Sequence, residues 1–383
     1  MQTRFQFLRL PHLYNSQMPL LYTISSLRTF VVMLFTFLLP ITLIQLHMHL
    51  GATESILFTI GLFLLFYMVM LICIPAVTGF VAKYGFHSAF PFALLLLTFV
   101  FVLFAWNRFI AGFVFFGFAA ELWWYSYHLY FTKTGDVKHF GRQIGVSEIL
   151  NLISSALAPL LGAYIIVMGG NTLISIVASI ITIITFVISL KMNKYVDNYP
   201  VSFKDIFSFT RTHKRDFVAF VGAGSEECIN SIVWPILLYQ VFNNLITVAA
   251  FSTVILILSV LLEYLVGKKS DDEDSMKMEK IGIIAMSTSW LGKALFQTPL
   301  MLGMFDLVHT LFAGFYRLPL QAISYQHAHE RKENYIAFRE MGYKVGYILG
   351  LLVFILIVLS GLPHWFIFFF AAVISLLPTE VRA

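Results

Sequence analysis

The chain has 383 residues, of which 59% are hydrophobic and 12% are charged, and its formal net charge is +5. Soluble domains are roughly half apolar and about one quarter charged, so this composition excludes an ordinary soluble protein and indicates an integral membrane protein. The two cysteines, Cys73 and Cys228, lie in apolar runs far apart in the sequence, which excludes a disulfide framework and a Cys-x-x-Cys metal site.

Long apolar runs follow one another along the chain. A helix needs roughly 20 apolar residues to cross a bilayer, and the runs are continuous rather than alternating, which excludes a membrane β-barrel. The first run is longer than the roughly 7–15 residues of a signal-peptide core, so it is predicted to be the first membrane helix. The sequence thus predicts an all-α integral membrane protein with twelve helices, at residues 20–46, 53–80, 87–106, 109–131, 143–169, 171–191, 216–242, 245–267, 280–298, 300–327, 334–360 and 363–379.

A polar stretch at 192–215 divides the twelve predicted helices into two groups of six. We therefore predict an N-terminal half at 1–191, a central cytoplasmic loop at 192–215 and a C-terminal half at 216–383. The sequence Arg142-Gln-Ile-Gly145 opens the fifth predicted helix, and Arg339-Glu-Met-Gly342 opens the eleventh, at an offset of 197 residues. Parallel six-helix repeats are known among transporters, and this offset predicts such a repeat.

Lysine and arginine are distributed asymmetrically along the predicted helices. With the N-terminus inside, 20 of the 25 lie in the tails, the inner loops or the inner helix ends. Because basic residues favour the cytoplasmic side, both termini are predicted to face the cytoplasm of a plasma (inner) membrane. The same asymmetry explains the basic composition without a nucleic-acid partner.

The organisation of the chain resembles the major facilitator superfamily over nearly its whole length. The loop after the second helix, GFVAKYGFH, matches that family's motif at Gly79, Lys83 and Gly85 but lacks its aspartate. The loop after the eighth helix keeps Asp271 four residues after Gly267. The resemblance implies that these loops form an inner gate, that Arg142 and Arg339 pair there with acids from the other loops, and that helices 3, 6, 9 and 12 face outward.

The fifth predicted helix resembles the family's antiporter signature at Gly145, Pro159 and Gly162, with small residues at the other motif positions. Small residues and proline permit close helix contact and a kink, and this pattern leans towards export. In the fourth helix, Phe113 stands where the antiporter pattern has an arginine. That departure weakens the antiporter interpretation.

Ionisable and polar side chains inside the predicted helices are candidates for substrate or proton binding. An ionisable group within the membrane is costly unless it is paired, so it indicates function by default. Glu121 and Glu227 lie near the predicted midplane, where each could carry a proton or contact substrate, or form a structural ion pair with Lys344 or Arg28. The candidates are Glu121, Tyr125, His128, Glu226, Glu227, Asn230, Asp306, Arg317 and Lys344.

Helical spacing places several of the candidate residues on shared helix faces. Glu121, Tyr125 and His128 recur on one face of the fourth helix. Asp306 and Arg317 share a face of the tenth but lie about 16 Å apart along it, so Arg317 needs a partner from another helix. Arg28 in the first helix either snorkels to the cytoplasm, which we favour, or binds an anionic substrate.

The sequence contains no P-loop, no His-Glu-x-x-His and no Gly-x-Ser-x-Gly motif, which argues against ATP-driven transport and against an enzyme. His327-Ala-His329 is too short to indicate a metal site, and no cofactor is implied. The first hypothesis is a monomeric secondary transporter that moves a small solute through the lipid bilayer by alternating access, with proton coupling as a sub-hypothesis. The alternatives are a lipid flippase and a non-transporting membrane receptor or assembly factor.

Overall fold

The computed structural model describes residues 17–135, 140–194, 199–270, 275–331 and 333–380, and within these it describes no side chains at 140–142, 261–270, 275–278, 329–331 and 379–380. The described residues form helices and no strand. Asp271 lies outside the described residues. Arg142 and Gly267 lie in helices, but their side chains are outside the described part.

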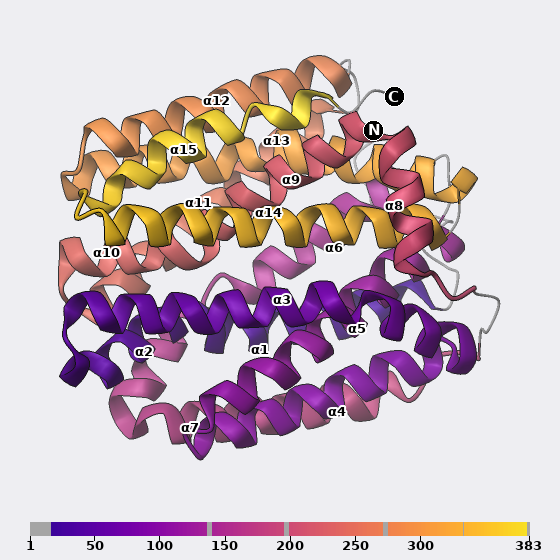
Figure 1. Cartoon of the computed structure of the whole chain (residues 1–383), viewed down its shortest axis with the longest axis horizontal. Coiled ribbons are helices and arrows are strands. Elements are labelled where there is room, and N and C mark those ends of the chain that lie inside the picture. Colours follow the sequence, from indigo (N-terminus) through magenta and orange to yellow (C-terminus); the bar gives the residue numbers. More distant parts are fainter. Residues whose placement is uncertain (1–16, 136–139, 195–198, 271–274, 332, 381–383) are drawn as a thin grey trace, which may run out of the picture.

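The N-terminal helices correspond closely to the predicted ones (Figure 1). The first is interrupted near Pro40, because proline cannot donate the helical hydrogen bond and clashes with the preceding turn. Gly169 and Gly170 have non-helical backbone angles inside α7, at the predicted boundary between the fifth and sixth helices. The elements are α1 (Met18–Thr36), α2 (Leu39–His47), η3 (Met48–Leu50), α3 (Ala52–Tyr84), α4 (Phe86–Ala105), α5 (Phe109–Thr134), α6 (Phe140–Ser155) and α7 (Ala158–Ser189).

The C-terminal helices also follow the prediction, with one change of register. A five-residue π-helix, η5, interrupts the seventh predicted helix immediately before Trp234 and Pro235. A π-turn shifts the residues that follow it relative to an α-helix, so Trp234 is displaced around the helix axis relative to Glu227. The elements are α9 (Lys214–Cys228), η5 (Ile229–Val233), α10 (Trp234–Phe242), α11 (Leu245–Ser270), α12 (Ser275–Leu295), α13 (Pro299–Arg331), α14 (Glu333–Leu359), η6 (His364–Phe366), α15 (Ile367–Ile374) and η7 (Leu377–Glu380).

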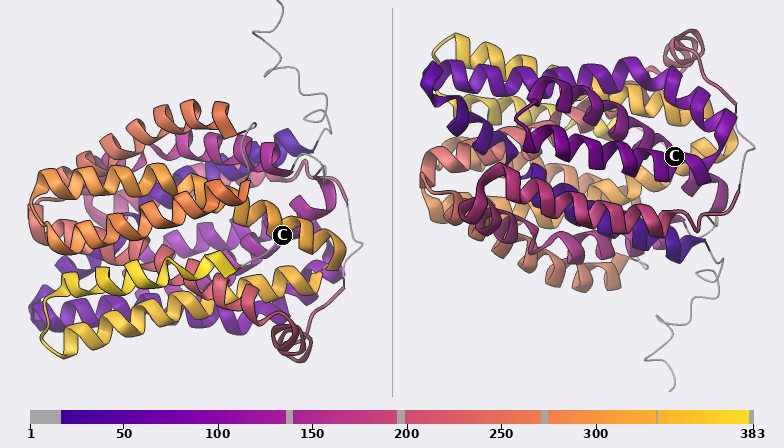
Figure 2. Two further views of the ribbon diagram at one scale, coloured as in Figure 1. Left: turned by 90° about the horizontal axis from the view of Figure 1, so that it is seen from above. Right: turned by 90° about the horizontal axis from the view of Figure 1, so that it is seen from below.

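The stretch predicted as a central loop contains a helix, α8 (Phe203–Thr212), at one end of the bundle and across the direction of the membrane helices (Figures 1 and 2). Ser202 and Asp205 form a reciprocal capping box at its start: Asp205 N–H donates to Ser202 Oγ at 3.3 Å, and Ser202 N–H donates to Asp205 Oδ2 at 3.0 Å. The Ser202 hydroxyl, at 2.6 Å, and the Ser202 N–H both donate to the Asp205 carboxylate, and these two hydrogen bonds lower the pKa of Asp205. Ile206 anchors the helix by its burial.

The helices pack as two groups that meet along shared faces (Figure 1). Helices α1 to α7 pack mainly on one another, and so do α9 to α15, while α3 with α14 and α7 with α11 join the groups. Glycines allow close approach: a Cβ at Gly162 would lie 2.4 Å from the Leu34 carbonyl oxygen, and one at Gly346 would lie 2.2 Å from that of Val221. Small residues thus let backbones touch within each group.

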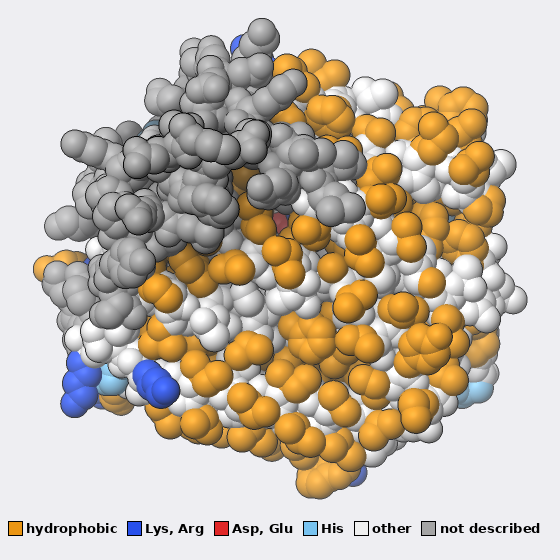
Figure 3. Space-filling model, turned by 180° about the vertical axis from the view of Figure 1, so that it is seen from behind, with side chains coloured by type: hydrophobic (Ala, Val, Ile, Leu, Met, Phe, Trp, Pro, Cys, Tyr) orange, Lys and Arg blue, Asp and Glu red, His pale blue; other side chains and the backbone are white. Residues whose placement is uncertain are grey.

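Apolar side chains cover much of the outer surface (Figure 3). They include Phe99 on α4, Ile180 on α7, Ile284 on α12 and Val373 on α15, all well exposed. These four helices are the ones predicted to face outward, but equally exposed apolar side chains also lie on α3 and α14, at Ile72 and Leu356. Within the described chain, seven helical segments are long and apolar enough to cross a membrane, and one of them, Gln143–Ser189, contains the Gly169–Gly170 break. The fold is that of a multi-pass, all-α membrane protein.

Candidate functional site: two buried charge networks

The first network joins the two groups of helices, and we call it the inter-half network: Glu121 and His128 on α5, Tyr325 on α13, and Arg339, Glu340 and Lys344 on α14. Lys344 Nζ lies 3.0 Å from Glu121 Oε2 and also donates to Glu340, one turn away on its own helix. The three side chains are almost fully buried. Lys344 is therefore shared by one carboxylate from each half.

His128 extends the inter-half network towards α13. Its Nδ1 lies 2.6 Å from the Tyr325 hydroxyl, and its Nε2 lies 3.6 Å from Glu340 Oε1. Gln321 donates to the same hydroxyl at 2.8 Å. The spacing in the fourth predicted helix thus brings Glu121 and His128 to one network, whereas the buried Tyr125 hydroxyl between them has no hydrogen-bond partner among the described residues.

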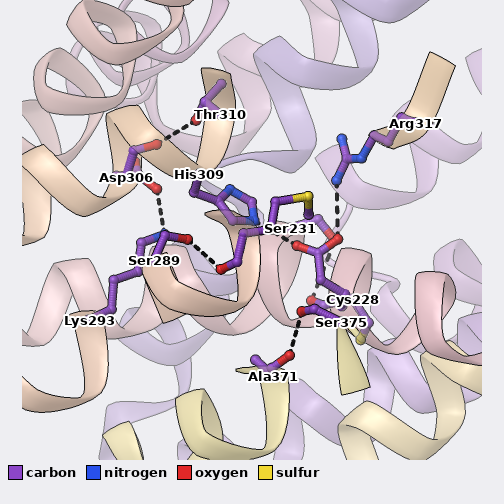
Figure 4. Close-up of polar contacts among 12 residues, drawn as sticks. Cys228, Ser231, Ser289, Lys293, Asp306, His309, Thr310, Arg317, Ala371 and Ser375 are labelled. Atoms are coloured by element: carbon purple, nitrogen blue, oxygen red, sulfur yellow. Dashed lines mark hydrogen bonds and ion pairs between the residues drawn. The ribbon is translucent and has the colours of Figure 1, made fainter. Parts of the chain in front are cut away.

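The second network lies within the C-terminal group, and we call it the second-half network: Glu226 on α9, Lys293 on α12, and Asp306, His309 and Arg317 on α13. Figure 4 labels Lys293, Asp306, His309 and Arg317. Lys293 Nζ lies 2.6 Å from Asp306 Oδ1. His309 Nε2 lies 2.7 Å from Glu226 Oε1, and Arg317 Nη2 donates to Glu226 Oε2 at 3.4 Å. Arg317 thus takes its partner from another helix, as its spacing from Asp306 requires.

Arg317 is the most exposed residue of the second-half network. Its side chain is 42% exposed, whereas that of Glu226 is 2% exposed. Glu148 on α6 and Glu227 on α9 interact electrostatically with Arg317, and both are half-buried. Neither has an ion-pair partner within the described residues, so these carboxylates and the exposed side of Arg317 can contact a solute. Asn230, the second residue of the π-helix η5, is also half-buried.

Several solved structures share this arrangement of helices. The human organic anion transporter MFSD10 superimposes with a TM-score of 0.75 at 13% identity, over 94% of this chain and 98% of that one. The fold is that of the major facilitator superfamily. The E. coli fucose:proton symporter FucP shares this fold, with a TM-score of 0.70 at 12% identity over 97% of this chain and 100% of that one. The proton:xylose symporter XylE also shares it, with a TM-score of 0.70 at 10% identity over 96% of this chain and 95% of that one.

No protein-family profile and no curated protein sequence matches the chain. The major facilitator fold is therefore recognised from the arrangement of its helices. At these identities the likeness establishes the fold alone, and the chemistry of the site has to be argued from the residues of this chain.

Several family-motif residues occupy structural positions in the major facilitator fold. Gly85 has a φ of 74° in the turn between α3 and α4, where a residue with a Cβ would be strained. Lys83 lies 5.1 Å from the centre of the Tyr84 ring, and a Cβ at Gly79 would meet nothing within 4 Å. Phe113, in the place of the antiporter arginine, is buried and packs edge-on against Phe63.

The resemblance to the antiporter signature has a structural counterpart. The helix is interrupted between the end of α6 at Ser155 and the start of α7 at Ala158. Pro159 occupies the first turn of α7, directly after this interruption. Gly162 contacts α1 closely, whereas Gly145 has open space around its Cα. In the corresponding part of the C-terminal group, a Cβ at Gly342 would lie 2.7 Å from Phe220 Cβ.

Two expectations about arginines are wrong. Arg28 does not snorkel to the cytoplasm: it is 5% exposed and lies against Trp123 and Trp124 of α5. Arg339 donates to Glu340 at 2.7 Å, within its own helix, and lies over the Tyr343 ring, so among the described residues it does not pair with acids of the loops. Arg339 has an ionic partner on its own helix, whereas Arg28 contacts aromatic rings of a neighbouring helix.

Lys293 and Glu340 were not among the candidate residues, yet both are central to the networks. The sequence signal for Lys293 was its position in a helix predicted to face outward, because a charge inside the membrane needs a partner. Glu340 could have been found from its spacing, because it precedes Lys344 by four residues and the two side chains therefore lie on the same helix face. No group of three or more potential metal ligands lies together in the described part of the chain.

Proposed function

We propose that the protein is a secondary active transporter that moves a small solute by alternating access. The N-terminal half (1–191) and the C-terminal half (216–383) would rock against each other about a site near the middle of the membrane. The major facilitator fold and the solute-accessible charges around Arg317 support this assignment. The structural neighbours, which carry an organic anion, fucose and xylose by their names, are transporters rather than enzymes.

The Glu121–Lys344 pair is the observation that carries the proposal. The two side chains come from opposite halves, so a rocking motion that separates α5 from α14 breaks their contact. Lys344 then keeps Glu340, but Glu121 has no second cation among the described residues. A buried carboxylate without its partner costs several kcal/mol, and a proton removes that cost.

Proton coupling at Glu121 follows from this asymmetry between the two partners. The titratable or charged groups that face Glu121 are Lys344 and Glu340 from α14, Tyr125 from its own helix and Cys73 from α3. Only Lys344 is positive, so separation of the halves removes the single counter-charge. Glu227 was the alternative proton carrier, but it is only half-buried and lies near the partly exposed Arg317, so we assign it to contact with the solute instead.

Transport by purified protein in proteoliposomes tests the proposal. A first panel of sugars, peptides and organic anions is suggested by the structural neighbours. We expect Glu121→Gln to abolish accumulation driven by a pH gradient while it preserves counterflow exchange, because glutamine mimics the protonated carboxyl. Glu54→Gln, an exposed position at the start of α3, is the matched control. Gradient-driven accumulation at the wild-type level in Glu121→Gln would exclude proton coupling at this residue.

Orientation and direction belong to the same proposal. The asymmetric distribution of lysine and arginine supports cytoplasmic termini in a plasma membrane. The break before Pro159 and the tight contact at Gly162 support the weak lean towards export. The chain is proposed to act as a monomer within lipid, without nucleic acid or cofactor.

A further inference from the structure

Arg28 is a buried cation that neither charge network uses. It lies ten residues beyond the start of α1 at Met18, about 15 Å along the helix at 1.5 Å per residue. Its side chain is 5% exposed. The Arg28 side chain is therefore enclosed by the helix bundle.

The contacts of Arg28 are aromatic rather than ionic. Its guanidinium carbon lies 4.7 Å from the Trp123 ring centre and 5.2 Å from that of Trp124. Among the described residues the guanidinium has no carboxylate partner and donates no hydrogen bond. A cation–π contact contributes about 0.5–2 kcal/mol, whereas an unpaired buried charge costs several kcal/mol, so the two indoles do not compensate for the burial.

Two serines on α1 lie close to Arg28 in the sequence. Ser25 precedes Arg28 by three residues, on the same helix face, and is buried. The hydroxyls of Ser25 and Ser26 both donate to Asn151 Oδ1 of α6, at 3.3 and 3.4 Å. Because both hydrogen bonds are long, these groups can turn to a better acceptor.

We propose that Arg28, together with Trp123 and Trp124, binds an oxyanion, a carboxylate or phosphate group, of the transported solute. The planar guanidinium has N–H donors that suit two oxygens of one such group. The indole rings suit a flat apolar body attached to it. This inference rests on the proposed transport function, since it assigns the chemical class of the solute.

A lipid headgroup phosphate carries the same chemistry, but depth favours a solute. A headgroup would have to enter about 15 Å along α1 to reach Arg28, if the helix is counted at 1.5 Å per residue. The binding experiment therefore includes lipid composition as a separate arm.

Thermal unfolding of the full chain in phosphatidylcholine nanodiscs tests the site with benzoate as the probe and benzamide as its uncharged counterpart. We expect benzoate, and not benzamide, to raise the Tm of the wild type by a few degrees. Arg28→Met should lose this shift, and without ligand it should unfold at or above the wild-type temperature because an unpaired charge has been removed. Arg28→Lys, which keeps the charge but not the fork of donors, should show a reduced shift. The exposed Arg108→Met is the matched control and should retain the full shift.

Other results would overturn the oxyanion site, its assignment to a solute, or the transport proposal. An equal shift with benzamide, or a full benzoate shift in Arg28→Met, overturns the oxyanion site. Stabilisation of the wild type by phosphatidylglycerol nanodiscs, absent in Arg28→Met and not reproduced by benzoate, overturns the assignment to a solute. A benzoate shift that requires Arg28, in a protein that exchanges no solute in counterflow, supports the site and overturns only the transport proposal.

Discussion

Lys293 illustrates how a buried charge is held in a helix that was predicted to face outward. Its side chain has no exposed area, its ammonium contacts Asp306, and the rings of Trp234 and Trp290 lie 4.1 and 4.3 Å from it. The ion pair and the two aromatic faces together replace the water that the ammonium lost. The pair is therefore a property of packing inside the C-terminal half, distinct from the pair that joins the halves.

Removal of one partner of this pair should be costly. We expect Lys293→Met to destabilise the protein by about 3–5 kcal/mol, because it leaves Asp306 buried and uncompensated. A second change, Asp306→Leu, should restore most of the loss by removing the remaining charge. Thermal unfolding in one detergent measures both effects, with the exposed Lys280→Met of the same helix as control. A double variant no more stable than Lys293→Met would contradict this account.

The sequence predicts which residues need partners better than it predicts the partners. Spacing along α13 required that Arg317 pair outside its own helix, and Glu226 is that partner. Depth along the helices made Lys344 a candidate partner of Glu121. The contacts of Arg28 could not be predicted in this way, because whether a long side chain snorkels or folds against neighbouring rings depends on tertiary packing.

At the scale of elements, the long membrane helices were predictable and the short helix was not. A window of about 20 apolar residues finds a membrane helix wherever it lies. Helix α8 has 10 residues, and its capping box and its amphipathic pattern around Ile206 mark it in the sequence, but it is too short and too polar for a window of that length. The π-helix η5 leaves no compositional signal, because it differs from an α-helix only in its hydrogen-bond register.

The contact between α1 and α7 depends on the absence of a side chain at Gly162. We expect Gly162→Ala to lower thermal stability, because its Cβ would lie 2.4 Å from the Leu34 carbonyl oxygen and the two helices must separate. Gly145→Ala, in the preceding helix α6, is the matched control: its Cβ meets nothing within 4 Å, and alanine favours a helix by about 1 kcal/mol. Unfolding temperatures of the two variants should change in opposite directions, and equal changes would refute the packing argument.

For the whole molecule, the two halves touch towards both ends of the bundle. At the end that carries α2 and α10, Gln45 donates to the Tyr239 hydroxyl at 2.7 Å. At the end that carries α8, Lys133 donates to Glu333 at 2.6 Å. Alternating access requires these two contacts to open in turn.

Cross-linking tests this requirement directly. In a chain with Cys73 and Cys228 replaced by serine, a short bis-maleimide should stop transport when it joins cysteines at 45 and 239, and also when it joins cysteines at 133 and 333. The hydrogen-bonded Gln240 and His364 lie within one half, so the same reagent at 240 and 364 should leave transport unchanged. Full activity after either inter-half cross-link would rule out rocking of the two halves.

The overall architecture was accessible from sequence because hydropathy, charge asymmetry and the repeated Arg-x-x-Gly step all recur at the scale of the whole chain. The sequence does not predict in the same way the faces along which the two halves meet. The contacts of α3 with α14 and of α7 with α11 depend on shape along entire helices, and no short motif encodes them.

The sharing of Lys344 between two carboxylates has an electrical consequence. Separation of α5 from α14 would leave Glu121 on one half, and a net single positive charge from Arg339, Glu340 and Lys344 on the other. A proton on Glu121 changes the charge carried by the first half by one elementary unit, and one such charge crossing the membrane is worth about 2.3 kcal/mol per 100 mV. The membrane voltage would therefore act differently on the protonated and unprotonated forms, so that one ion pair makes the cycle sensitive to both pH and potential.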